Sequence, residues 1–103
     1  MALVLMFVTS PDEETASKLA EGALEVKLAA CILRAPVESL YNWQGEKYQE
    51  GEILTLFKTS IENADSLEEW IAENHPYETP AIIRLGARAN DSYEKWLVEM
   101  LEA

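Results

Sequence analysis

The fold of this chain is decided by its first apolar stretch, residues 2–8, with the sequence Ala-Leu-Val-Leu-Met-Phe-Val. A strand-length run that is apolar at every position is typical of a strand covered on both faces. A helix start follows directly, because Ser10 can cap a helix, Pro11 suits its first position and Glu13 completes a capping box. We therefore expect a buried strand that leads into a helix from about residue 11 to about residue 27. Apolar residues at helical spacing give this helix a single stripe: Ala16, Leu19, Ala20, Ala23 and Leu24.

Residues 29–59 have the pattern of a long β-hairpin. A strand is predicted over residues 29–43, with an edge position or a bulge near Pro36, because proline lacks the amide hydrogen that a central strand needs. The polar segment 44–47 contains Gly45 and is typical of a hairpin turn. Residues 52–59 return as the second strand. The two arms are long enough to project past the core of a small domain.

The remaining sequence predicts a helix, a strand and a helix. The second helix is capped by Asn63, Asp65 or Ser66 and ended by His75 and Pro76. A last strand is expected over residues 81–85, and a third helix opens at Asn90 or Asp91. The apolar faces of the two helices, which we expect to pack in the core, comprise Leu67, Trp70 and Ile71 in one and Tyr93, Trp96, Leu97, Met100 and Leu101 in the other.

The element order β-α-β-β-α-β-α predicts an α+β fold for a single domain, residues 1–103. Its first six elements have the ferredoxin-like, split βαββαβ arrangement, and the last is a C-terminal helix. Right-handed crossovers place the first two helices on the same face of the sheet. The other face is then bare, although the strand at residues 2–8 is apolar on both sides. We therefore expect an obligate oligomer in which a neighbouring copy covers that face.

Composition narrows the classes of function. The chain has 19 acidic and 8 basic residues, a net charge of −11, and its basic residues are scattered. Nucleic-acid binding requires clustered positive charge, so this class is excluded. The apolar run at residues 2–8 is too short to span a membrane and follows no basic segment. Cys31 is the only cysteine, so no intrachain disulfide can form. We expect a cytoplasmic protein without a targeting segment.

Four separate segments resemble one protein family in their order and spacing. They are PDEE at residues 11–14, KLAAC at 27–31, YNWQGE at 41–46 and HPYETP at 75–80. Together they closely resemble the CutA family of divalent-cation tolerance proteins, and the resemblance covers essentially the whole chain. One departure is a shortening by one residue between Cys31 and Ser39. Because side chains alternate along a strand, this shortening predicts a changed bulge near Pro36.

The resemblance implies both an assembly and a function. It implies a ferredoxin-like homotrimer, similar in architecture to PII signalling proteins, with hairpin arms that pack across subunits and clefts between the subunits. It also implies a role in tolerance of copper and other divalent metals. A protein partner of unknown identity is a further possibility that this architecture implies.

Three residues are candidate metal ligands: His75, Glu78 and Cys31. Histidine and cysteine are ligands that copper favours, and Glu78 could add an oxygen. One histidine and one cysteine are too few for a tight site within one chain, so we expect weak sites between subunits, and no cation that folding requires. The alternatives are structural: Cys31 as a small buried apolar residue, and His75 as a helix-ending residue bonded to a last-turn carbonyl.

A second candidate site is a ligand cleft formed by Lys58, Trp43, Tyr77 and Tyr41. Aromatic walls with one positive charge would suit a small anionic molecule, although a strand lysine can equally extend to solvent. This cleft supports an alternative function as a PII-like sensor that acts through a protein partner; a stable trimeric scaffold is another. No enzyme activity is expected, because no nucleophile, base and orienting group are placed together by the sequence.

Overall fold

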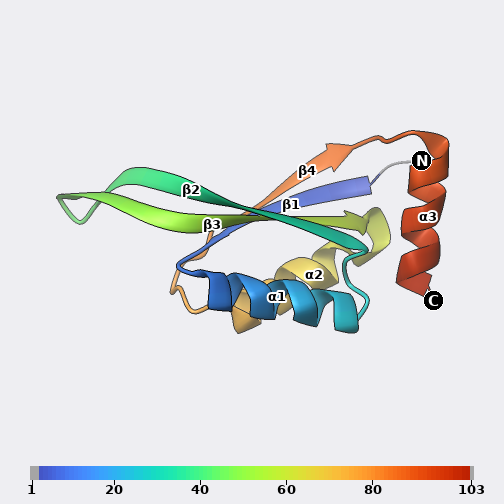
Figure 1. Cartoon of the computed structure of the whole chain (residues 1–103), viewed down its shortest axis with the longest axis horizontal. Coiled ribbons are helices and arrows are strands. Elements are labelled where there is room, and N and C mark those ends of the chain that lie inside the picture. Colours follow the sequence, from blue (N-terminus) through green and yellow to red (C-terminus); the bar gives the residue numbers. More distant parts are fainter. Residues whose placement is uncertain (1–2, 103) are drawn as a thin grey trace.

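The computed structural model describes residues 3–102 (Figure 1). Four strands and three helices follow one another in the predicted order. Their bounds are β1 (Leu3–Ser10), α1 (Glu13–Glu25), β2 (Cys31–Trp43), β3 (Glu46–Ser60), α2 (Ile61–Asn74), β4 (Ile82–Ala87) and α3 (Asp91–Glu102).

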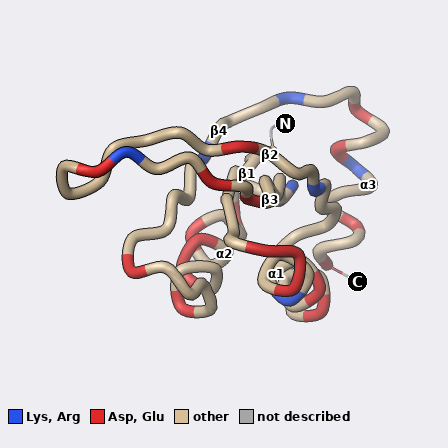
Figure 2. Tube along the Cα trace, turned by 60° about the vertical axis from the view of Figure 1, so that its left-hand side comes forward, with Lys and Arg blue, Asp and Glu red and all other residues tan. Residues whose placement is uncertain are grey.

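The four strands form one antiparallel sheet in the order β2-β3-β1-β4. Helices α1 and α2 lie side by side below the sheet in Figure 1, whereas α3 stands at its end. The core lies between the sheet and these two helices, where Met6, Phe57, Leu67 and Ile71 are fully buried. The predicted α+β, ferredoxin-like fold is therefore confirmed. Acidic residues are spread along α1, α2 and the β2–β3 hairpin (Figure 2).

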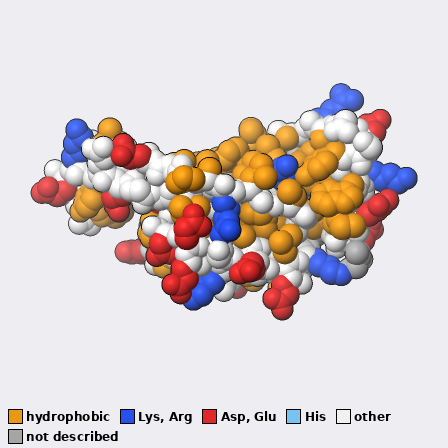
Figure 3. Space-filling view, viewed as in Figure 1, with side chains coloured by type: hydrophobic (Ala, Val, Ile, Leu, Met, Phe, Trp, Pro, Cys, Tyr) orange, Lys and Arg blue, Asp and Glu red, His pale blue; other side chains and the backbone are white. Residues whose placement is uncertain are grey.

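The sheet face opposite α1 and α2, which we call the outer face, is apolar and largely uncovered. Phe7 pairs with Ile83 and Leu5 with Leu85, so these paired side chains share one face. Ile83 is 60% exposed and Leu85 is 53% exposed. Figure 3 shows hydrophobic side chains gathered over the sheet beside α3. Within residues 3–102, α1 and α2 leave this face uncovered, as the topology predicts, and α3 contacts it at Lys58.

The β2–β3 hairpin extends well beyond the core and gives the molecule a length of 46 Å against a width of 23 Å (Figure 1). Its turn is Gln44-Gly45, two residues that both have positive φ, at 50° and 81°. This is the pattern of the tight hairpin turns whose twist matches the strands. The projecting arms are confirmed, and β3 starts six residues before its predicted start.

Of the two alternatives predicted for Pro36, the edge position is confirmed and the bulge is wrong. The pairing of β2 with β3 runs without a break from Cys31 opposite Lys58 to Trp43 opposite Glu46, and Pro36 lies opposite Ile53. The physical reason is that β2 is an edge strand. A proline there can turn its missing amide hydrogen away from the ladder, so no extra residue is needed.

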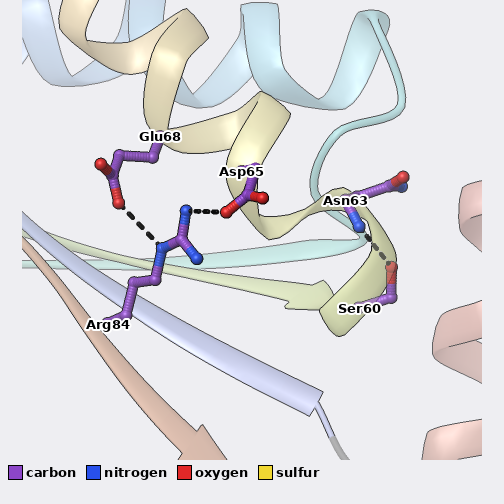
Figure 4. A network of polar contacts seen from close by, with 5 residues as sticks. All are labelled: Ser60, Asn63, Asp65, Glu68 and Arg84. Carbon is purple, nitrogen blue, oxygen red and sulfur yellow. Dashed lines mark hydrogen bonds and ion pairs between the residues drawn. The ribbon is translucent and has the colours of Figure 1, made fainter.

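Two helix starts also differ from the prediction. The cap of α1 is Asp12, whose carboxylate accepts the amide of Thr15 at 2.8 Å, whereas Ser10 is the buried last residue of β1. The cap of α2 is Ser60, whose hydroxyl accepts the amide of Asn63 at 3.2 Å (Figure 4). The last residue of β3 is itself the cap of α2, whereas the cap of α1 lies two residues beyond the end of β1. The predicted end of α2 at His75 is confirmed.

Helix α2 is held against both α1 and the sheet. Gly22 of α1 faces Trp70 of α2 so closely that a β-carbon at Gly22 would lie 2.6 Å from the indole ring. On the other side, the guanidinium of Arg84 in β4 contacts Asp65 at 2.6 Å and Glu68 at 2.8 Å (Figure 4). These contacts hold the helix that leads into the His75 segment.

Trp96 of α3 is 39% exposed in the single chain, although we expected it in the core.

Candidate functional site

His75 fastens the segment after α2 to the end of β1. His75 is 8% exposed. Nε2 lies 2.8 Å from the carbonyl oxygen of Thr9, and Nδ1 accepts the amide of Tyr77 at 3.1 Å. These partners require the tautomer with its proton on Nε2, because a carbonyl accepts and an amide donates. Both ring nitrogens are therefore engaged with the backbone.

Tyr77 extends from this anchored segment to the base of the hairpin. Its hydroxyl donates to Oε2 of Glu52 in β3 at 2.7 Å, and the hydroxyl of Ser39 in β2 donates to the other oxygen of the same carboxylate. Burial, followed by the bond to Glu52, raises the pKa of Tyr77 well above its ordinary value of 10.0. The phenol therefore stays neutral and acts as a donor.

Tyr41 and Tyr48 continue the site along the hairpin. Their rings stack with centroids 5.4 Å apart, and the hydroxyl of Tyr41 donates to Glu50. This hydrogen bond is the largest cause that raises the pKa of Tyr41 to about 12. Trp43 follows two residues later on the same face of β2 and is 52% exposed.

These side chains surround a pocket of about 490 Å³, which we call the hairpin-base pocket. Aromatic and acidic residues supply most of its larger side chains. Its lining comprises Thr9, Tyr41, Trp43, Glu52, Tyr77, Glu78, Thr79 and Ala81. Among residues 3–102, neither Glu52 nor Glu78 forms an ion pair. The pocket is thus aromatic, polar and negatively charged.

The structure brings together three of the four residues predicted for the ligand cleft. Tyr41, Trp43 and Tyr77 line the pocket, but Lys58 lies farther along β3. The ammonium group of Lys58 is 3.3 Å from the hydroxyl of Tyr93 and lies 5.1 Å from the centre of its ring. In the single chain, the aromatic wall is therefore joined by carboxylates instead of the predicted positive charge.

The three predicted metal ligands are not grouped in one chain. Glu78 lines the pocket and His75 is adjacent to it, but Cys31 is paired with Lys58 at the far end of β2. In the part of the chain that the structure describes, no group of three or more His, Cys, Asp or Glu residues is placed to hold a metal ion. The carboxyl oxygens of the pocket could contribute to a shared site.

Sequence reasoning missed Glu52 and Ser39. The signal that would have found them is the pairing register of the hairpin. A two-residue turn at Gln44-Gly45 fixes the pairing of Val37 with Glu52, which places Glu52 on the same face as Ser39.

Across residues 3–102, no helix is both long and apolar enough to cross a membrane.

Comparison with known proteins gives consistent matches over nearly the whole chain. The sequence model of the family described as CutA1 divalent ion tolerance protein matches residues 4–100. The divalent-cation tolerance protein CutA of Yersinia pestis (strain Pestoides F) is 40% identical over 96 residues, which cover 91% of this chain and 81% of that protein.

Solved structures of similar proteins share the fold. CutA from Synechococcus elongatus PCC7942 is 36% identical with a TM-score of 0.91, and the match covers 97% of this chain and 90% of that one. CutA1 from Pyrococcus horikoshii is 34% identical with a TM-score of 0.91, over 94% and 96% of the two chains. The periplasmic divalent cation tolerance protein CutA from Archaeoglobus fulgidus is 28% identical with a TM-score of 0.93, over 96% and 98%.

Proposed function

Because this chain belongs to the CutA1 family of divalent ion tolerance proteins, we propose that it contributes to divalent-cation tolerance by binding copper or another divalent cation weakly between the subunits of a homotrimer. This is a family of tolerance proteins and not a known family of enzymes. The proposed role is accordingly binding and not catalysis.

The family match carries the tolerance role, and the scarcity of ligands within one chain is the reason for proposing weak binding between subunits. Both nitrogens of His75 are hydrogen-bonded, and within residues 3–102 no three ligating side chains converge. A tight site for a transition metal uses three or four ligands, so a single chain supports weak binding at best. In this proposal Glu78 supplies an oxygen ligand and Cys31 of a neighbouring copy supplies a sulfur ligand. His75 can supply a nitrogen ligand only where one of its two hydrogen bonds is broken.

The apolar outer face supports the assembly. Leu33, Ile83 and Leu85 are each more than half exposed on this face, an arrangement that favours burial against other copies. We propose that the trimer forms there and that folding requires no cation, because the core is built from apolar side chains. Neither alternative function, a PII-like sensor with a protein partner or a scaffold, is favoured by the comparisons.

We further propose a cytoplasmic location, supported by the single free cysteine, Cys31. The Archaeoglobus fulgidus relative is described as periplasmic, so location needs a direct test. Fractionation of cells that produce the protein should recover it with cytoplasmic markers; recovery with the periplasmic fraction would contradict this part of the proposal.

Titration with Cu²⁺ by calorimetry tests the metal-binding proposal. We expect saturable, weak binding that decreases in both Glu78→Gln and Cys31→Ser and is unchanged in Glu69→Gln, an exposed carboxylate of α2. If neither Glu78→Gln nor Cys31→Ser alters binding, these residues are not ligands. If the wild type shows no saturable binding of Cu²⁺, Zn²⁺ or Co²⁺, the metal-binding proposal is wrong.

A growth assay tests the cellular role separately. In a bacterial strain that lacks its own CutA protein, production of this chain should restore growth at an inhibitory copper concentration. The Glu78→Gln variant, produced at the same level, should restore growth less. Equal growth with and without the wild-type protein would contradict the tolerance role.

A further inference from the structure

The loop between α2 and β4, residues 75–81, carries Glu78, the carboxylate that we propose as a metal ligand. These residues form neither a helix nor a strand, so side-chain contacts fix their position. The first contact is made by His75, whose Nε2 lies 2.8 Å from the carbonyl oxygen of Thr9 and whose Nδ1 accepts the amide of Tyr77. The loop is therefore anchored to the end of β1 at its own first residue.

A second contact joins the same loop to the hairpin. The hydroxyl of Tyr77 donates to Oε2 of Glu52 in β3 at 2.7 Å. The other oxygen of this carboxylate accepts the hydroxyl of Ser39 in β2. Glu52 thus connects both strands of the hairpin to the loop. All three residues belong to one chain, so this connection is made without a neighbouring copy.

The bond between Tyr77 and Glu52 is of a strong kind. A hydrogen bond to an ionised carboxylate stabilises a structure more than one between two neutral groups does. Burial, followed by the bond to Glu52, raises the pKa of Tyr77 above its ordinary value of 10.0, so the phenol remains a donor at neutral pH. Ser39 holds the carboxylate from its other side and so fixes the orientation in which it meets Tyr77.

This connection limits where the Glu78 side chain can lie. Glu78 directly follows Tyr77, and the short stretch that contains them is bounded by Pro76 and Pro80, whose own φ angles are fixed near about −65°. A ligand that must meet a second ligand from a neighbouring copy binds a cation more tightly when its position is fixed beforehand. We propose that Glu52 is a positioning residue of the proposed metal site, which holds Glu78 in place through Tyr77. This inference rests on the proposed function, because it takes Glu78 as a ligand.

Amide exchange in the assembled, metal-free protein is the first test. The amide of Tyr77 donates to His75, so its exchange rate reports opening of the loop. We expect Tyr77→Phe, which removes only the hydroxyl, to speed this exchange by about tenfold or more, the factor that a lost hydrogen bond to a charged group implies. Tyr41→Phe is the matched control and should not speed it, because the hydroxyl of Tyr41 donates to Glu50 within the hairpin. Equal exchange in the two variants would overturn the proposal.

Calorimetric titration with Cu²⁺ separates a positioning role from direct ligation. Glu52→Leu and Glu52→Gln remove the same charge, but only a glutamine keeps an oxygen that can accept the hydroxyl of Tyr77. We expect dissociation constants at least about threefold higher than that of the wild type in Tyr77→Phe and in Glu52→Leu, with tighter binding in Glu52→Gln than in Glu52→Leu. Tyr77→Phe changes no charge and provides the test if Glu52→Leu fails to fold. Equal binding by the two Glu52 variants, or wild-type binding by Tyr77→Phe, would show that Glu52 does not position the site.

The positioning role and the metal-binding proposal fail in different ways. If the wild type binds Cu²⁺ and Tyr77→Phe binds it equally well, only the positioning role is overturned. If the wild type shows no saturable binding of Cu²⁺, Zn²⁺ or Co²⁺, the metal-binding proposal is wrong, and the positioning role that rests on it is overturned with it.

Discussion

At the residue scale, His75 provides a direct test of a structural role. In His75→Ala the carbonyl of Thr9 and the amide of Tyr77 lose their partner in the folded state. We expect the free energy of unfolding to fall by about 1–3 kcal/mol, the usual cost of leaving partly buried polar groups without a bond. Urea denaturation at a fixed protein concentration, followed by circular dichroism, measures this change.

The neighbouring residue supplies the control. Asn74 is exposed, and its side chain bonds the carbonyl of Trp70 within α2 at 2.8 Å. Asn74→Ala should change the free energy of unfolding by no more than about 0.5 kcal/mol, as is usual for surface positions. Equal effects of the two substitutions would contradict the anchoring role of His75.

Tyr41 makes a prediction about alkaline pH. Its pKa of about 12 in the folded protein exceeds its ordinary value of 10.0, because its hydroxyl donates to Glu50. The fold therefore favours the neutral phenol, so the contribution to stability is fully present below pH 10.0 and is lost as the pH rises through about 12. Ultraviolet titration of the tyrosines should show that Glu50→Gln lowers the pKa of Tyr41 back toward 10.0. An unchanged titration curve would contradict the role of Glu50 in raising this pKa.

The contacts of these residues show the limit of prediction at this scale. The sequence indicated that His75 ends a helix and offered a last-turn carbonyl as its partner. The carbonyl that it meets belongs to Thr9, 66 positions away. Likewise, the partner of Tyr77 is Glu52, which is 25 positions away. Local patterns predict where a chain turns, but such long-range pairs depend on how the strands are aligned in the folded sheet.

At the scale of elements, the hairpin turn allows a comparison of two glycines. Gly45 has a φ of 81°, whereas Gly51 in β3 does not have a positive φ, and an added β-carbon meets no atom within 4 Å at either position. Any difference between the alanine variants therefore reflects backbone conformation. Gly45→Ala should cost about 1–2 kcal/mol, and Gly51→Ala should be neutral or slightly stabilising. Amide exchange along β2 and β3 measures this; equal exchange in both variants would contradict the left-handed turn.

The hairpin also shows which element bounds could be predicted. The prediction located the inner part of β3, as residues 52–59, and every second residue from Ile53 to Thr59 is buried. Residues 46–51 are exposed and polar, so hydrophobic patterning gives no signal for them. Their strand structure follows from an unbroken pairing with β2. The same register forms the hairpin-base pocket, and for this reason the sequence predicted its aromatic residues but not Glu52.

At the scale of the whole molecule, topology predicted more than composition did. The order of the elements required α1 and α2 on one face, and within residues 3–102 these two helices leave the apolar outer face uncovered. That inference needed only the handedness of the crossovers. The number of copies in the proposed assembly depends on the shape of the assembled surface, which a single chain does not contain. Trp96, expected in the core, is an exposed residue that an assembly could bury.

The outer face can be tested with two leucines of similar exposure. Leu85 lies on the outer face and is 53% exposed, and Leu24 lies on α1 and is 47% exposed. A charged side chain in an apolar interface is costly, so Leu85→Glu should dissociate the assembly, whereas Leu24→Glu should leave it intact. Light scattering after gel filtration should give three times the chain mass of 11.6 kDa for the wild type and Leu24→Glu, and one chain mass for Leu85→Glu. Because the exposed face then remains in water, Leu85→Glu should also melt at a lower temperature, with its secondary structure retained. A trimer in Leu85→Glu would exclude this part of the sheet from the interface, and a monomeric wild type would contradict the proposed assembly.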